Sequence, residues 1–423
     1  MKTSITINGN VRQWRRYPAR KPVDLDWCRE VPSHWSVAAL KRFARFQSGD
    51  GITALEIEPE GEFPVFGGNG LRGYTSKYTH DGDFVLLGRQ GALCGNVNYA
   101  SGRFWASEHA VVATPSKTVC LRWYGELLRA MDLGRYSMSA AQPGLSVQFV
   151  VSLLAPIPPL DEQRRIVAFL DRETFKIDAL IAKKERLVEL LLEKRQAIGS
   201  HAVTKGLNRT VPMKESGIEW AGKIPAHWQV KRAKFLFRQS NLPVRDGEGV
   251  VTAFRDGQVT LRENRRTEGF TFAILEVGYQ GIRKGQLVLH SMDAFAGAIG
   301  VSESDGKCSP EYIVCDPLAP DFFPEFYAPC LREMSRQRFI EVSCQAVRER
   351  APRIRFSTFG EMWLPVPPRE EQLAIAALII NSRQRYEEYI RTLRRSINMH
   401  REFHTALISA AITGKIDVRE EIV

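Results

Sequence analysis

The residues best suited to chemistry are basic and amide side chains that cluster in two parts of the chain. The first part offers six candidates: Asn69, Arg72, Tyr74, Lys77, Arg89 and Gln90. The second part offers seven arginines in two groups: Arg262, Arg265 and Arg266, and then Arg348, Arg350, Arg353 and Arg355. Arginine pairs bidentately with guanine, asparagine and glutamine pair with adenine, and lysine mainly contacts phosphate. A solvated surface explains any one of these residues, but together they favour contact with nucleic acid.

The charge of the whole chain supports this interpretation. The 423 residues include 59 Lys and Arg against 48 Asp and Glu, which gives a net charge of +11 and a pI near 9.3. Such a basic balance is typical of nucleic-acid-binding proteins. Hydrophobic residues make up 44% and charged residues 25% of the chain, which excludes wholesale disorder. The length predicts roughly two to four domains.

The motifs of several enzyme classes are absent or incomplete. Gly68–Gly73 matches G-x-G-x-x-G, but no helix pattern and no acid about 20 residues later follow it, so a glycine-rich loop is the better interpretation. The chain has no P-loop motif and no Asn/Asp-Pro-Pro-aromatic motif of adenine methyltransferases. His400 and His404 have the spacing of a zinc site, but we expect them to pack rather than bind metal. We therefore expect a protein without catalytic residues, metal or cofactor of its own.

Cysteine usage and hydropathy indicate where the protein works. The seven cysteines include no C-x-x-C pair, so neither a disulfide framework nor a zinc ribbon is expected. The N-terminus lacks the apolar core of a signal peptide, and no apolar run approaches the ~18 residues of a membrane span. We expect a cytoplasmic protein.

Two separate motifs occur twice, in the same order. Val31–Trp35 (VPSHW) recurs as Ile224–Trp228 (IPAHW), an offset of 193 residues. Pro156–Gln163 (PIPPLDEQ) recurs as Pro365–Gln372 (PVPPREEQ), an offset of 209 residues. This pattern predicts a duplicated chain whose two halves are related by a pseudo-twofold axis.

Each PIPP-type motif opens a long segment with acids in its first turn and no proline, which predicts a long helix at 161–205 and another within 369–423. A seven-residue apolar repeat runs along both. The predicted pairing residues are Leu170, Ile177, Leu180, Leu187, Leu191, Ile198, Ile379, Tyr386, Tyr389, Leu393, Phe403 and Leu407. We expect the two helices to pair as an antiparallel coiled coil; the alternative is that each packs on its own block.

The remaining segments predict an α+β fold. Residues 22–160 and 206–368 read as two mixed α/β blocks, the second including a linker, with strands expected at 63–66, 84–87, 110–113, 250–254 and 286–290. Residues 1–21, which include Arg12, Arg15, Arg16, Arg20 and Lys21, read as a solvated basic tail, with a DNA-binding arm as the alternative.

The residues quoted above resemble a known family. Lys214–Trp220 followed by Ile224–Trp228 resembles the usual opening of specificity subunits of type I restriction–modification systems. The two Pro-x-Pro-Pro-x-x-Glu-Gln motifs, each leading into a long helix that ends near Thr-Lys-Gly or Thr-Gly-Lys, resemble the hallmark of that family. The resemblance covers nearly the whole chain, apart from the basic extension at the N-terminus.

This resemblance implies a function. Each block would be a target recognition domain that reads one half of a bipartite site in double-stranded DNA. The helices would set the spacing between the half-sites and dock two modification subunits. S-adenosylmethionine, ATP and Mg would then belong to partner modification (methyltransferase) and restriction (translocase and nuclease) subunits, and this chain would be non-catalytic.

Three other functions remain open from the sequence. The chain could be a stand-alone DNA-binding regulatory or architectural protein, a coiled-coil scaffold without a DNA role, or a fragment of a fused restriction–methylation enzyme. The recognised bases cannot be deduced, because base readout depends on loop geometry.

Overall fold

A computed structural model describes residues 2–7, 10–91, 93–116, 118–137, 144–265, 277–343 and 353–420. The chain divides into two compact units. Unit 1 comprises Met1–Arg186 with Leu393–Val423, and unit 2 comprises Leu187–Thr392. The boundary runs through the two long helices, so each unit contains one mixed block and part of both helices.

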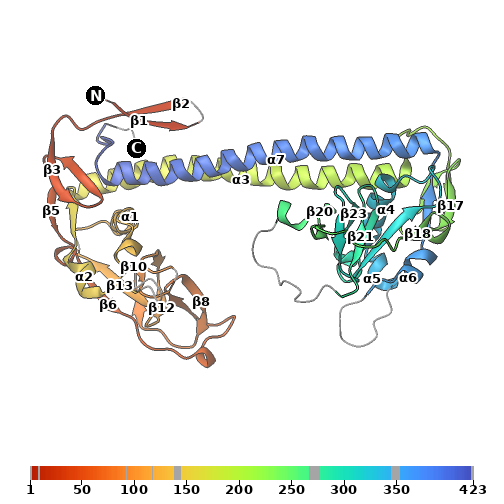
Figure 1. The fold of residues 1–423 in the computed structure, drawn as a ribbon. Helices are drawn as coiled ribbons and strands as arrows, with labels where there is room; N and C mark the ends of the chain where they lie inside the picture. Colours follow the sequence, from red (N-terminus) through yellow and green to blue (C-terminus); the bar gives the residue numbers. More distant parts are fainter. Residues whose placement is uncertain are drawn as a thin grey trace. The chain divides into compact units, whose positions relative to one another are not determined.

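The long helices are α3, Leu160–Lys205, and α7, Arg369–Ile412. Each begins after a Pro-Pro pair and carries two acids in its first turn, which favours helix initiation through the helix dipole. They pack antiparallel, as predicted (Figure 1). In unit 1, Lys184 donates a hydrogen bond to Ser396, and in unit 2, Arg195 lies 3.5 Å from Glu387. The alternative, that each helix packs on its own block instead of on the other helix, is therefore wrong.

The buried seam follows the prediction only in part. Leu170, Ile177, Phe403 and Leu407 are buried. Leu191, Ile198, Ile379, Tyr386 and Leu393 are half-buried. The prediction is wrong for three residues that are 39–45% exposed: Leu180, Leu187 and Tyr389.

The error lies in the second row of the seam. On α3, one row of buried or half-buried residues is Ile177, Lys184, Leu191 and Ile198, and the other is Ile181, Val188 and Arg195, so the seven-residue repeat holds in both rows. The second row lies one residue later than predicted, which leaves Leu187 outside the interface and places Val188 in it.

The block of unit 1 contains a sheet in the order β11-β10-β13-β6 and another in the order β8-β7-β12-β9. Their bounds are β6 Ala44–Ser48, β7 Phe63–Gly67, β8 Gly70–Thr75, β9 His80–Asp81, β10 Phe84–Gly88, β11 Val97–Ala100, β12 Arg103–Ala106 and β13 Ala110–Pro115. The helices α1, Leu121–Ala130, and α2, Val147–Ser152, follow them. Strand β14, Leu154–Ile157, pairs with β5, Ser36–Ala39.

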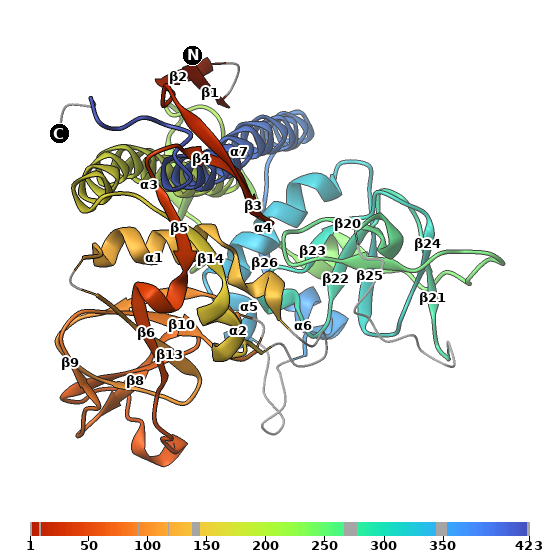
Figure 2. The same ribbon diagram turned by 90° about the vertical axis from the view of Figure 1, so that its left-hand side faces the viewer.

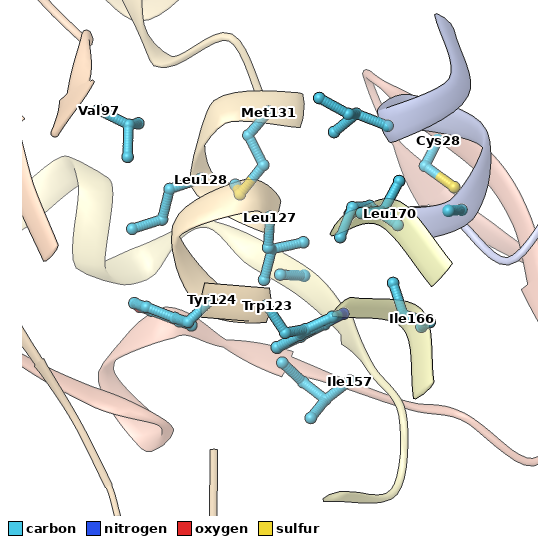
Figure 3. Packing of buried hydrophobic residues seen from close by; sticks show 14 of the residues in the cluster. Cys28, Val97, Trp123, Tyr124, Leu127, Leu128, Met131, Ile157, Ile166 and Leu170 are labelled. Atoms are coloured by element: carbon cyan, nitrogen blue, oxygen red, sulfur yellow. The ribbon is translucent and has the colours of Figure 1, made fainter. Parts of the chain in front are cut away.

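The core of unit 1 joins this block to the helix pair. Trp123 and Leu127 of α1 are fully buried and belong to one cluster with Ile166 and Leu170 of α3 (Figure 3). Leu407 of α7 belongs to the same cluster. Burial of such apolar surface contributes roughly 25 cal/mol per Å², so the block and the helix ends stabilise each other.

The block of unit 2 repeats this plan. Its main sheet has the order β18-β25-β22-β23, and Figure 2 labels three of these strands, β22, β23 and β25. Strand β17 pairs with β26 as β5 does with β14. The bounds of the strands and helices are β17 Gln229–Arg232, β18 Phe237–Gln239, β19 Val251–Ala253, β20 Val259–Leu261, β21 Gln280–Ile282, β22 Leu287–His290, β23 Ile299–Val301, β24 Gly306–Cys308, β25 Tyr312–Pro317, β26 Trp363–Val366, α4 Pro324–Arg336, α5 Phe339–Ser343 and α6 Phe356–Glu361. The matching strand order shows that the duplication extends into the blocks.

The N-terminal residues form strands, which corrects the prediction of a solvated tail. Strands β1, Lys2–Ile7, and β2, Asn10–Arg15, pair as a hairpin, and β3, Arg20–Leu25, pairs with β4, Cys28–Pro32. Trp14 and Tyr17 are 7% and 4% exposed, and Trp14 stacks on Phe403 of α7 at 6.2 Å. These two aromatic side chains fix the segment to unit 1.

The second half has an equivalent of β3 and β4. Strands β15, Met213–Glu215, and β16, Lys223–Pro225, pair antiparallel. Lys21 donates to the carbonyl of Trp35, and Lys214, at the offset of 193, donates to that of Trp228. The segment around Lys21 is therefore part of the repeated frame.

Candidate nucleic-acid interface

The two repeated motifs contact each other in each unit. In unit 1, Glu162 lies 2.8 Å from Nε2 of His34 and accepts a 3.0 Å hydrogen bond from the indole of Trp35. Tyr17 also donates to Glu162, and burial and this hydrogen bond raise the pKa of Tyr17 above its ordinary value. In unit 2, His227 and Trp228 contact Glu371 at 2.9 and 3.0 Å. Each contact holds the first strands of a block against the start of a long helix.

The glutamine that follows each glutamate ties the same helix to a second part of the block. The side-chain oxygen of Gln163 accepts from the backbone N–H of Cys120 at 2.8 Å. Gln372 accepts from the backbone N–H of Phe323 at 3.0 Å. Cys120 and Phe323 precede α1 and α4, respectively. The block is thus held at two points, which fixes its orientation on the helix end within each unit.

In unit 1, polar side chains gather where several strands end or begin; we call this group loop cluster 1. Arg89, directly after β10, donates to Ser48 at the end of β6 at 3.3 Å. Gln90 lies 3.2 Å from the ring of His109, just before β13. Asn69, after β7, accepts from Asn96 at 3.3 Å. These arginine, amide and imidazole side chains are the types that read base edges.

In unit 2, Ser291, Met292, Glu311, Arg353 and Arg355 form the corresponding group, loop cluster 2. Arg353 lies 3.1 Å from Glu311 and 3.5 Å from the sulfur of Met292. Arg355 is exposed and lines a hollow of about 470 Å³. Arg353 and Arg355 therefore lie near the end of β22 and the start of β25.

The two clusters occupy equivalent positions in the duplicated fold. In unit 1, the N–H of Leu145 donates to the carbonyl of Arg89 at 2.9 Å, and in unit 2, the N–H of Ile354 donates to that of Ser291 at 3.1 Å. Leu145 and Ile354 differ by the same 209 residues as the two PIPP-type motifs. The candidates Arg89 and Gln90 in the first block and Arg353 and Arg355 in the second block were chosen separately from the sequence, and they lie in equivalent regions of the repeated block.

The other candidates of the first block do not all join loop cluster 1. Arg72 is exposed, and its side chain lies against Gly67, close in sequence to Asn69. Tyr74 exchanges backbone hydrogen bonds with Glu58, and the charge of Lys77 acts on Glu56. Tyr74 and Lys77 therefore face the loop around residues 56–61 rather than loop cluster 1.

Two arginines of the first group in the second block, Arg262 and Arg265, contact other side chains of the protein. Arg265 forms hydrogen bonds of 2.9 and 2.8 Å to Asp256 and lies over the ring of Phe254. Burial alone would raise the pKa of Asp256, but hydrogen bonds from Arg265 and from the Gln258 amide lower it. Arg262 donates to Thr252 at 3.4 Å. Three further predicted contacts lie outside the described residues: Arg266, Arg348 and Arg350.

Some residues of the site were missed by the sequence analysis. Ser48, Asn96 and His109 belong to loop cluster 1, although no local motif marks them. The feature of the sequence that could have pointed to them is their position next to apolar runs that form strands. Lys21 could have been found, because the 193-residue offset relates it to Lys214.

The structure also bears on metal and membrane binding. Within the described part of the chain, no group of three or more His, Cys, Asp or Glu residues could hold a metal ion. His400 is 7% exposed and lies 2.6 Å from the carbonyl of Ser396, so it packs, as we expected. Among the described residues, no helix has the length and hydropathy of a membrane span.

The chain is similar to several known proteins. Residues 32–190 match the family described as "Type I restriction modification DNA specificity domain". The chain is 41% identical over 137 residues to the type I restriction enzyme EcoprrI specificity subunit of Escherichia coli, covering 31% of this chain and 34% of that protein. It is 24% identical over 217 residues to the MjaVIII specificity subunit of Methanocaldococcus jannaschii, covering 48% and 49%. The chain therefore matches a third to a half of the length of these relatives.

A solved structure shares the fold over a longer range. A chain from work on complex assembly and conformational transition of the type I R-M system has a TM-score of 0.66, at 15% identity, over 91% of this chain and 99% of that one. This likeness concerns the fold alone. The sequence matches show that residues 32–190 are similar to the type I restriction modification DNA specificity domain, and that part of the chain is similar to type I restriction enzyme specificity subunits.

Proposed function

We propose that this chain is the DNA-reading, non-catalytic subunit of a type I restriction–modification complex. Each block reads one half of a bipartite site in double-stranded DNA. The observation that carries this proposal is the equivalence of loop clusters 1 and 2, where Arg89–Gln90 and Arg353 lie at the same place in two copies of one fold. The duplication supports one reader in each unit, and the net charge of +11 favours phosphate contact.

The two readers differ in the side chains that they present. Loop cluster 1 carries Gln90, Asn69 and His109, whereas loop cluster 2 carries Met292 and Glu311. Amide side chains pair with adenine, and a carboxylate accepts from cytosine N4. The two halves of the site should therefore differ in sequence.

The helices supply the remaining parts of the function. Both α3 and α7 run through both units, which supports a role in setting the spacing between half-sites. Exposed apolar residues along α3, including Phe175 at 73% and Leu187 at 44%, support docking of modification subunits. In this proposal S-adenosylmethionine, ATP and Mg act on the modification and restriction subunits.

A block exchange tests the proposal. Residues 22–155 are replaced by the first block of another family member, and methylated sites are mapped in cells that also express the modification subunits. The expected result is a change in one half of the methylated sequence and no change in the other half. A change in both halves contradicts independent readers, and an unchanged sequence contradicts a reading role for this block. If the chain were a stand-alone regulator, the methylated sites would be the same in cells with and without its gene.

A further inference from the structure

Unit 2 contains a cavity that the proposed DNA reading does not use. It has a volume of about 720 Å³ and lies between the second half of α3, the first half of α7, helix α4 and the loops around Asp256 and Ala296. Small-molecule sites commonly have volumes of roughly 300–1,000 Å³. Five arginines line it, against three acids: Arg195, Arg255, Arg332, Arg336 and Arg383 against Asp256, Glu333 and Glu387.

Four of these arginines have an acid partner. Arg336 pairs with Glu333, Arg255 lies 3.0 Å from Asp293, and both Arg383 and Arg195 contact Glu387, at 2.9 and 3.5 Å. Asp256 is held by Arg265 through two hydrogen bonds.

Arg332 of α4 is different. Within the described part of the chain, its Nε is buried without a hydrogen-bond partner. Its guanidinium lies against Gly257, where a side chain would approach within 2.4 Å of it. Burial first, and then the charges of Arg383 and Arg195, lower the pKa of Arg332, against the opposing charge of Asp256. A buried cation beside further cations is costly unless an anion accompanies it.

The first half of the chain shows how the same arginine is neutralised. The hydrogen bonds to Gln163 and Gln372 align Cys120 with Phe323, and this alignment places Arg129 of α1 opposite Arg332. Arg129 donates two hydrogen bonds of 2.8 Å to Glu126, three residues earlier. The residue equivalent to Glu126 in α4 is Pro329. Unit 2 has therefore kept the arginine and lacks its acid.

Two further positions also carry a more positive charge in unit 2 than in unit 1. At the offset of 209 residues, Glu173 of α3 corresponds to Ser382 of α7, and Thr174 corresponds to Arg383. Glu173 is 5% exposed, whereas Ser382 and Arg383 line the cavity of unit 2. Unit 2 thus lacks the acids that unit 1 carries as Glu126 and Glu173 and has the additional cation Arg383, whereas Glu333 stands where unit 1 has Ala130, and Asn381 where it has Arg172.

We propose that the cavity of unit 2 binds a small phosphate-bearing anion, with Arg332 as its main ligand and Arg383 and Arg195 completing the charge. Guanidinium groups bind phosphate oxygens bidentately. The apolar side chains of Leu192, Phe295 and Ile379 on the cavity wall give room for an organic part of the ligand. Because the three arginines come from α4, α7 and α3, a bound anion would join the second block to both helices.

Titration of the full-length chain with inorganic pyrophosphate, at constant ionic strength, tests this proposal without DNA. Calorimetry should show saturable binding, and the midpoint of thermal unfolding should rise with pyrophosphate concentration. Arg332→Met should weaken the binding at least tenfold. Arg391→Met serves as the matched control, because Arg391 is exposed on α7 and does not line the cavity; it should leave the affinity unchanged.

Pro329→Glu gives a test that does not depend on a loss of stability. It restores the acid that unit 1 carries at this position and should abolish pyrophosphate binding while the midpoint without ligand stays the same or rises. Equal affinity of wild type, Arg332→Met and Pro329→Glu would overturn the proposal, and so would binding of a short DNA duplex at this cavity in place of pyrophosphate. Since no DNA reading enters the assay, its outcome is independent of the proposed function.

Discussion

The indole N–H of Trp35 donates a 3.0 Å hydrogen bond to Glu162. The equivalent pair in the second half, Trp228 and Glu371, forms a hydrogen bond of the same length. The VPSHW-type and PIPP-type motifs, which lie more than 120 residues apart in the sequence, therefore contact each other, and the same contact occurs in both halves of the chain. The contact connects each block to the N-terminus of a long helix.

Removing the acceptor in unit 2 should destabilise that unit. Glu371→Ala leaves the buried indole of Trp228 and the ring of His227 without their partner, which should cost about 1–3 kcal/mol. Glu370→Ala is the control, because Glu370 is exposed in the same helical turn and contributes similarly to the helix dipole. Chemical denaturation followed by tryptophan fluorescence measures both. Equal losses would show that the contact adds nothing beyond the dipole.

The position of the second row of the seam predicts a difference between two neighbouring residues on α3. Val188 is 9% exposed and Leu187 is 44% exposed. Val188→Ala should lower the free energy of unfolding by roughly 1–2 kcal/mol because it removes buried methyl groups, whereas Leu187→Ala should change it by less than about 0.5 kcal/mol. Urea denaturation compares the two. The opposite order would place Leu187 in the seam and Val188 outside it.

The arginines of the second block should separate into two functional classes. Arg353→Ala should weaken binding of the cognate duplex by about 1–3 kcal/mol and relax one position if Arg353 contacts a base. Arg265→Ala should leave DNA affinity unchanged and lower stability, because it removes the arginine that pairs with the carboxylate of Asp256. Fluorescence anisotropy of the complex with modification subunits, combined with thermal unfolding, measures both effects. Unchanged DNA binding by Arg353→Ala would remove loop cluster 2 from the interface.

His290 at the end of β22 predicts a pH dependence of stability. Burial lowers its pKa below the ordinary value of 6.5; the charges of Asp293 and Glu311 oppose this shift and that of Arg255 adds to it. As the pH falls below 6.5, the unfolded chain takes up a proton that the folded protein still excludes, so His290 makes stability fall between pH 7 and about pH 5. His290→Gln should flatten this part of the curve of unfolding midpoint against pH. An equally steep curve in the variant would assign the loss to other groups.

A matched insertion tests the spacing role of the helices. Four residues are added to both α3 after Glu193 and α7 after Glu388, two exposed positions. Four residues lengthen a helix by about 6 Å and rotate it by about 40°, so the gap between half-sites should grow by one to two base pairs while the bases stay the same. A two-residue insertion at both sites rotates the helix by about 200° and should abolish modification. Mapping of methylated sites compares them, and an unchanged gap in the four-residue variant argues against a spacer.

The sequence alone was sufficient for the parts of the protein that repeat. The VPSHW and PIPPLDEQ motifs and their second copies predicted the duplication, the two blocks and the antiparallel helices, because helix starts and apolar periodicity are local properties of the chain. The predicted strands at 84–87 and 286–290 were also correct, since short apolar runs between glycines specify buried strands.

Only the tertiary structure decided how individual side chains are used. Arg265 looks the same in the sequence as Arg353, and each pairs with an acid, Asp256 and Glu311, respectively, but the side chain of Arg265 is 35% exposed and that of Arg353, in loop cluster 2, is 59% exposed. Trp14 and Tyr17 are buried because α3 and α7 of unit 1 provide a surface for them, which no pattern within a basic segment reveals. Burial and charge pairing depend on residues far apart in the chain, and the fold alone brings those residues together.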